Sequence, residues 1–228
     1  MKGKAKQMEK QRLRSLEAVV FDMDGLMFNT EALGERCMRT VLAQHGYTLT
    51  HEFYLKMVGS SGKITRAMQF AEFGEDYPHD LLARQTHDLM QSEIKTHGLE
   101  IKPGLMELLA FLKQEKIPCC VASSTRHAGV ENYLQIAGIQ DYFQFIVGGD
   151  EVNLSKPNPD IFLKALEKAK VSSSDALVLE DSINGIKASR AAAIPVICVP
   201  DMIMPPKDIR AHCLCLVDSL DHVITLLK

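Results

Sequence analysis

Short apolar runs alternate with segments of helical periodicity along the second half of the chain, and this alternation restricts the fold more than any other feature. Strands of this kind, separated by helices, form parallel sheets, because each right-handed crossover places its helix on a face of the sheet. The sequence therefore predicts an α/β fold with a doubly wound, Rossmann-like parallel sheet. The expected strands are 17–21, 117–122, 145–147, 176–179, 195–199 and 213–217, and the expected helices are 127–137, 159–170 and 183–193, with a further helix at the end.

Local signals predict where some of these helices begin and end. Gly138 is expected to close the helix over 127–137. Asn158 followed by Pro159 predicts an N-cap and a first helical residue. Asp181 or Ser182 is expected to cap the helix over 183–193.

The first strand is separated from the others by a stretch of different character. Residues 31–98 show amphipathic helical periodicity, which predicts about four helices and no strand. We therefore expect an α/β core formed by residues 16–30 and 99–228, interrupted by an inserted α-helical cap domain over 31–98. Residues 1–15 form a basic tail, which is read either as a solvated terminus, the favoured interpretation, or as an arm that contacts an anionic partner.

Composition narrows the class of protein. The 228 residues are 46% hydrophobic and 24% charged with a formal net charge of -3, which gives no global reason to expect nucleic-acid or membrane binding. Neither a signal peptide nor an apolar run of membrane-spanning length is visible. The six cysteines lack metal-ligand spacing and four lie in apolar runs, as expected of reduced, buried thiols. We expect a cytoplasmic protein, for which a monomer is plausible.

Acids, hydroxyls and one lysine directly follow the expected strands. Ligands of open parallel sheets bind beyond the carboxyl ends of the strands, so these side chains are the candidates for a site. They are Asp22 and Asp24 after the first strand, Ser123, Ser124 and Thr125 after the second, Lys156 beyond the third, and Glu180 and Asp181 after the fourth.

This set of side chains favours phosphoryl transfer. Carboxylates gathered in one crevice repel one another and need a cation, and oxygen ligands of this kind favour Mg²⁺. One carboxylate can attack phosphorus, and a second, two residues further on, can act as acid and base. By themselves, however, Asp22 and Asp24 are equally well explained as turn formers after a strand.

Four segments in this order resemble the haloacid dehalogenase superfamily, in its phosphatase and β-phosphoglucomutase-like branch with a helical cap. They are Phe-Asp-Met-Asp-Gly-Leu at 21–26, Ala-Ser-Ser at 122–124, Ser-Lys-Pro-Asn-Pro-Asp at 155–160 and Leu-Glu-Asp-Ser-Ile-Asn-Gly-Ile at 179–186. The resemblance implies a magnesium-dependent phosphatase that hydrolyses small phosphorylated metabolites, chiefly sugar phosphates, through an aspartyl-phosphate. It implies that Asp22 is the nucleophile and Asp24 the acid and base. Ser123, Ser124 and Lys156 are implied to bind phosphate, and the implied metal site is formed by Asp22, Asp24, Glu180 and Asp181.

Three other functions are weighed against this one. A sugar phosphomutase would share the fold, but mutase members tend to carry a histidine where Gly34 aligns, which favours a hydrolase. A phospho-accepting receiver domain would need only about half of this length. A dehalogenase would lack Asp24 and Asp181. Residues of the helical insertion are expected to select the substrate.

Overall fold

The computed structural model describes residues 16–60 and 62–228, and the predicted basic tail over 1–15 lies outside the described residues. The chain divides into two compact units. The α/β unit comprises the described residues up to Phe28 together with Ile101–Lys228, and the helical unit is Asn29–Glu100.

A single parallel sheet of six strands forms the centre of the α/β unit, in the order β3-β2-β1-β4-β5-β6. This confirms the predicted fold class. Every residue of β1, β2 and β4 is buried, which explains why these strands are continuous apolar runs in the sequence. The strands are β1 (Ala18–Phe21), β2 (Cys119–Ala122), β3 (Ile146–Val147), β4 (Ala176–Glu180), β5 (Val196–Cys198) and β6 (Cys215–Leu216).

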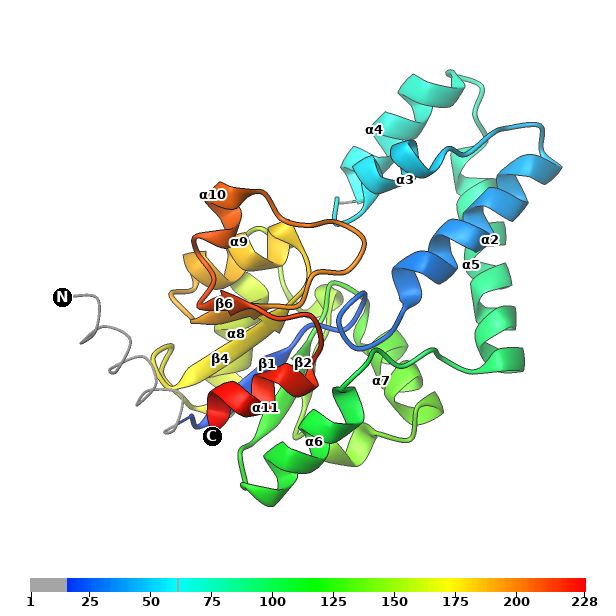
Figure 1. The fold of residues 1–228 in the computed structure, drawn as a ribbon. Helices are drawn as coiled ribbons and strands as arrows, with labels where there is room; N and C mark the ends of the chain where they lie inside the picture. The colour runs from blue at the N-terminus through cyan, green and yellow to red at the C-terminus, as the bar shows by residue number, and fades with distance from the viewer. Residues whose placement is uncertain (1–15, 61) are drawn as a thin grey trace. The chain divides into compact units, whose positions relative to one another are not determined.

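Helices cover both faces of this sheet (Figure 1). Helices α8 (Asp160–Ala169) and α9 (Ile183–Ala191) pack on one face, against alternate residues of β1, β2 and β4. Helices α6 (Leu105–Gln114) and α11 (Asp221–Leu227) contact each other on the opposite side in Figure 1. The remaining elements are α7 (His127–Ile136), α10 (Lys207–Arg210) and the short 3₁₀ helices η1 (Gln140–Tyr142) and η2 (Gly149–Glu151).

Four helices form the described part of the helical unit, as the sequence predicted. Helix α2 (Thr30–Gln44) packs along α5 (His79–His97), and α3 (His51–Met57) and α4 (Gly62–Phe73) complete the unit. Edge-to-face and stacked rings help to hold these helices together. The rings include Tyr47, Phe53, Phe73 and Tyr77.

One local prediction is corrected by the structure, and one helix was missed. The N-cap of α8 is Pro159 and not Asn158, whose side-chain amide donates instead to the carbonyl of Ser155 at 3.0 Å. Helix α6 was not predicted, although its buried leucines at 105, 108, 109 and 112 have helical spacing. Ser182 does cap α9, because its hydroxyl accepts a hydrogen bond from the Gly185 N–H at 3.0 Å.

The cysteines are free thiols, and four of the six are buried. None of the described helices combines the length and the apolar character that crossing a membrane requires.

Candidate active site

The carboxyl ends of the three central strands carry the polar side chains that the sequence singled out. Asp22 follows β1, Ser123 follows β2, and Asp181 follows β4, whose last residue is Glu180. The Asp22 N–H continues the ladder to Leu179 of β4 at 3.0 Å. The sheet therefore places these side chains at one edge, because all three strands run in the same direction.

Lys156 joins two of these acids. Its Nζ donates to Asp22 Oδ1 at 2.5 Å, to Glu180 Oε1 at 2.6 Å and to the carbonyl of Ala122 at 3.3 Å. The residue is buried, and its ammonium also lies over the ring of Phe162. Burial alone would lower the pKa of Lys156, but the two carboxylates raise it, so the lysine is a fixed positive charge at neutral pH.

Glu180 is fully buried and uses both of its oxygens. While Oε1 accepts from Lys156, Oε2 accepts from the backbone N–H groups of Asp181 at 3.0 Å and Ser182 at 2.9 Å. The space for this carboxylate depends on Gly185, where a Cβ would lie 1.7 Å from Glu180 Oε1. Glu180 thus holds the lysine and fixes the turn between β4 and α9.

Asp22, Glu180 and Asp181 form a buried acidic cluster in which one oxygen of each lies within 4.8 Å of the others. Burial raises the pKa of Asp22 most, Glu180 raises it further and Lys156 opposes the rise, giving about 8. Burial raises the pKa of Asp181 well above its usual range, and the neighbouring Glu180 and Asp22 raise it further. Asp181 Oδ1 is buried and makes no hydrogen bond to the described part of the chain.

This cluster fits a divalent cation. A buried oxygen without a partner, beside other carboxylates, is costly unless a cation or a proton compensates it. All of the donors are oxygens, the type of ligand that Mg²⁺ prefers. The side chains of Asp22 and Asp181 could bind the ion, and Glu180 is the third acid of the cluster.

Asp24 is oriented by hydroxyls from the end of β2. Its Oδ2 accepts from Thr125 Oγ1 at 2.7 Å and from Ser123 Oγ at 3.3 Å. Ser123 is buried and its hydroxyl also accepts from the Thr125 N–H at 3.1 Å, whereas Ser124 is exposed. Thr125 was one of three candidate hydroxyls in the sequence, and a separation of 101 residues hides its contact with Asp24.

Two more residues near the acidic cluster were not identified from the sequence. Lys102 Nζ donates to Asp201 Oδ1 at 2.5 Å. Asp201 lies in the loop after β5, and its Oδ2 approaches Gly25 from the same side as the Asp181 carboxylate. Neither residue belongs to a recognisable motif, so the sequence offers no signal for this pair.

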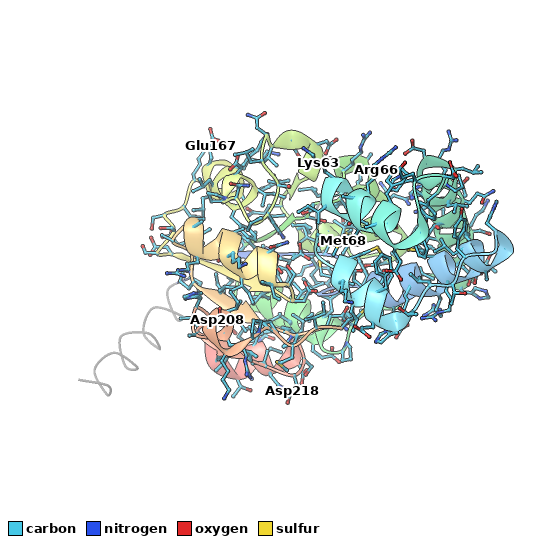
Figure 2. All side chains as sticks on the ribbon, turned by 90° about the horizontal axis from the view of Figure 1, so that it is seen from above. Lys63, Arg66, Met68, Glu167, Asp208 and Asp218 are labelled. Carbon is cyan, nitrogen blue, oxygen red and sulfur yellow. The ribbon has the colours of Figure 1, made fainter. Side chains whose placement is uncertain are left out.

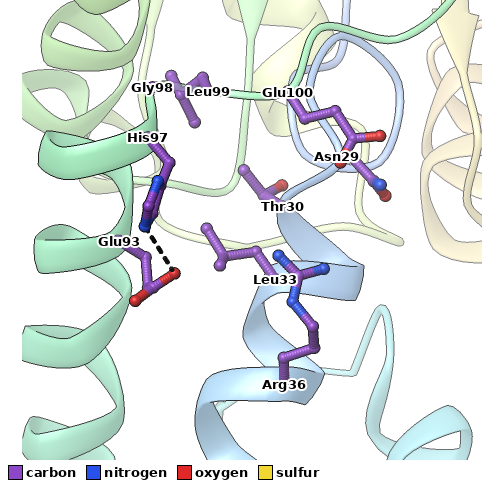
Figure 3. Close-up of a pocket in the computed structure, with 9 residues that line it drawn as sticks. All are labelled: Asn29, Thr30, Leu33, Arg36, Glu93, His97, Gly98, Leu99 and Glu100. Carbon is purple, nitrogen blue, oxygen red and sulfur yellow. Dashed lines mark ion pairs between the residues drawn. The ribbon is translucent and has the colours of Figure 1, made fainter.

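Two of the cavities are lined only by described residues of the helical unit. The first, of about 370 Å³, lies where the chain enters and leaves the unit and is shown in Figure 3. Its ionisable residues are Arg36, Glu93, His97 and Glu100, and the His97 Nε2 lies 3.9 Å from Glu93 Oε2. The second, of about 320 Å³, lies among α2, α4 and α5, and its lining includes the apolar side chains of Met38, Leu42, Leu82 and Met90.

Comparison with known proteins identifies the family. The profile described as haloacid dehalogenase-like hydrolase matches residues 19–199. The chain is 29% identical over 184 residues to a phosphorylated carbohydrates phosphatase of Thermotoga maritima, covering 78% of this chain and 82% of the relative. A crystal structure of CbbY from Rhodobacter sphaeroides, in complex with xylulose-(1,5)bisphosphate, covers 93% of this chain and 99% of its own, with a TM-score of 0.79 and 26% identity.

The chain therefore belongs to the haloacid dehalogenase-like hydrolase family, and it is an enzyme of the phosphatase branch. It is also 31% identical over 210 residues to a bifunctional riboflavin kinase/FMN phosphatase of Arabidopsis thaliana. The match covers 92% of this chain but only 53% of that protein, so the chain spans about half of the length of this relative.

Proposed function

We propose that the chain is a Mg²⁺-dependent phosphatase that hydrolyses small phosphorylated metabolites, with sugar phosphates as the main class, through an aspartyl-phosphate at Asp22. One observation carries this proposal. A buried lysine and a buried acidic cluster meet at the end of β1, within 2.5 Å at the closest contact, and one acid of the cluster retains an oxygen without a partner. Such an arrangement is suited to a cation and a phosphate group bound together.

The first step forms the aspartyl-phosphate. An oxygen of Asp22 attacks phosphorus, the bond from phosphorus to the leaving oxygen breaks, and Asp24 supplies the proton that the leaving oxygen takes up. Thr125 holds Asp24 in place for this transfer. Lys156 neutralises negative charge on the phosphoryl group and on Asp22, and Ser123 and Ser124 offer hydroxyls to the phosphate oxygens.

The second step releases phosphate. Asp24, now without its proton, accepts one from a water molecule whose oxygen attacks the phosphorus of the aspartyl-phosphate. The bond between phosphorus and Asp22 breaks, inorganic phosphate leaves, and Asp24 is protonated again. Both aspartates return to their starting states, so that the cycle balances.

The proposed metal ligands are the side chains of Asp22 and Asp181 and the backbone carbonyl of Asp24. The cation would offset the repulsion between these carboxylates and a phosphate dianion. We propose that Glu180 supports the site through its charge and its hold on Lys156, because hydrogen bonds already occupy both of its oxygens.

The names of two relatives support the proposed substrate class. One is named for phosphorylated carbohydrates, and one solved structure contains a sugar bisphosphate. We propose that the helical unit acts as a cap that selects among such substrates and excludes water until the second step.

Phosphate release from a panel of about a hundred phosphorylated metabolites, with Mg²⁺ and with a chelator in excess, tests the proposal. We expect turnover of sugar phosphates that requires Mg²⁺ and disappears in Asp22→Asn. The exposed Asp218 provides the matched control Asp218→Asn, with the same change of charge and full activity expected. Activity in the presence of chelator, or in Asp22→Asn, would contradict the proposal.

A further inference from the structure

Asp201 lies beside the acidic cluster but outside it. It follows β5 by three residues, and its side chain is only 9% exposed. Its Oδ2 is buried and has no hydrogen-bond partner among residues 16–60 and 62–228. An unpaired carboxylate oxygen in such a place is costly, so its position needs an explanation.

Gly25 shows how near Asp201 is to the proposed metal ligand Asp181. A Cβ at Gly25 would lie 2.4 Å from Asp181 Oδ2 and 3.1 Å from Asp201 Oδ2. Both carboxylates therefore approach the same side of Gly25. Burial raises the pKa of Asp181 most, and Asp201 is among the charges that raise it further.

Lys102 anchors Asp201 from the other side. The Lys102 Nζ donates to Asp201 Oδ1 at 2.5 Å, and the Lys102 backbone N–H donates to the carbonyl of Met27 at 2.9 Å. The lysine side chain is 20% exposed, so that the pair is mostly shielded from water. One oxygen of Asp201 is thus fixed, and the other is left free on the side of the acidic cluster.

We propose that Asp201, held by Lys102, is a positioning residue for Mg²⁺ binding: it is not itself a ligand, but its free Oδ2 places a fixed negative charge beside Asp181, which favours a divalent cation there. This inference rests on the proposed magnesium site. Partners outside the ligand set that orient ligands commonly change metal affinity by 10–100-fold when they are removed.

A simpler role is a clamp that only joins the loop after β5 to the segment around Lys102. The two roles differ in what they change. A clamp would alter the melting temperature and leave the Mg²⁺ affinity unchanged. A positioning residue changes the Mg²⁺ affinity, and it changes the KM for Mg²⁺ more than kcat at saturating Mg²⁺.

The test measures the Mg²⁺ dissociation constant of the full chain by calorimetry, together with the melting temperature in chelator. We expect Asp201→Asn to bind Mg²⁺ about 10-fold more weakly, with kcat at saturating Mg²⁺ close to that of the wild type. The control is Asp208→Asn, which makes the same change at an exposed residue of α10, labelled in Figure 2, and should leave the dissociation constant unchanged.

Lys102→Met distinguishes the effect of anchoring Asp201 from the effect of the positive charge of Lys102. Removing a positive charge alone would strengthen Mg²⁺ binding, whereas loss of the anchor weakens it, and we expect weaker binding. Unchanged affinity in Asp201→Asn, or tighter binding in Lys102→Met, would overturn the inference and leave the proposed function intact. Wild-type protein that neither binds Mg²⁺ nor needs it for turnover would instead overturn the proposed function.

Discussion

Gly25→Ala is a sharp test of how closely the chain packs around Asp181. Gly25 has a φ of +82°, in the left-handed region, and a Cβ there would lie 2.4 Å from Asp181 Oδ2. The backbone strain costs about 1 kcal/mol. The contact is too short to tolerate, so the Asp181 carboxylate must move, at a further cost of about 1–3 kcal/mol.

Gly138→Ala is the matched control. Gly138 also lies in the α/β unit with a positive φ, +66°, but a Cβ there would meet nothing within 4 Å. This variant should lose about 1 kcal/mol of unfolding free energy and keep its activity. The difference between the two variants therefore isolates the displacement of Asp181 from the backbone strain that they share.

Urea unfolding and Mg²⁺-dependent phosphate release measure the two effects. We expect Gly25→Ala to lose about 2–4 kcal/mol of unfolding free energy. Because a displacement of about 1 Å near the chemistry can cost about 100-fold in rate, we expect a loss of activity of that order. Activity of Gly25→Ala within twofold of Gly138→Ala would refute the reasoning.

Three further predictions concern the surroundings of the site. Gly185→Ala would place a Cβ 1.7 Å from Glu180 Oε1, so we expect a loss of at least about 10-fold in kcat/KM and a lower melting temperature. Lys156→Met leaves two buried carboxylates unpaired, and urea unfolding should show a loss of about 3–5 kcal/mol together with loss of activity. Burial opposes ionisation of Glu151, but hydrogen bonds from the Gly148 N–H and nearby cationic side chains lower its pKa to about 2. This stabilisation is present above the unfolded pKa near 4.5 and is lost as the pH falls towards 2, so Glu151→Gln should cost about 1–2 kcal/mol at pH 7 and much less at pH 2. A gap between wild type and Glu151→Gln that stays constant with pH would contradict the last of these.

The sheet and its strand ends were predictable because buried parallel strands are continuous apolar runs. The runs of β1, β2 and β4 end visibly at a polar residue, at Asp22, Ser123 and Glu180, and the order of the strands then brings these ends together. The helical insertion was predictable for a similar reason, since periodicity of about 3.6 residues is a strong signal over long segments.

The contacts around those residues were not predictable, because they join distant parts of the chain. Lys102 and Asp201 are 99 residues apart, and so are Ser123 and Asp24. Pairings of this kind depend on the tertiary fold and leave no local pattern. The prediction of the N-cap of α8 was wrong for a local reason. Asn158 and Pro159 both favour the start of a helix, and the helix begins one residue later than expected.

Chemical trapping of the phosphoryl group on the chain tests the central claim most directly. The enzyme is mixed with substrate and Mg²⁺, quenched in acid and reduced with borohydride, which converts an aspartyl-phosphate into homoserine, and the product is located by peptide mass spectrometry. We predict homoserine at position 22 in the wild-type protein and none in Asp22→Asn. Turnover without any modification at Asp22, or with the modification at another residue, would contradict the account.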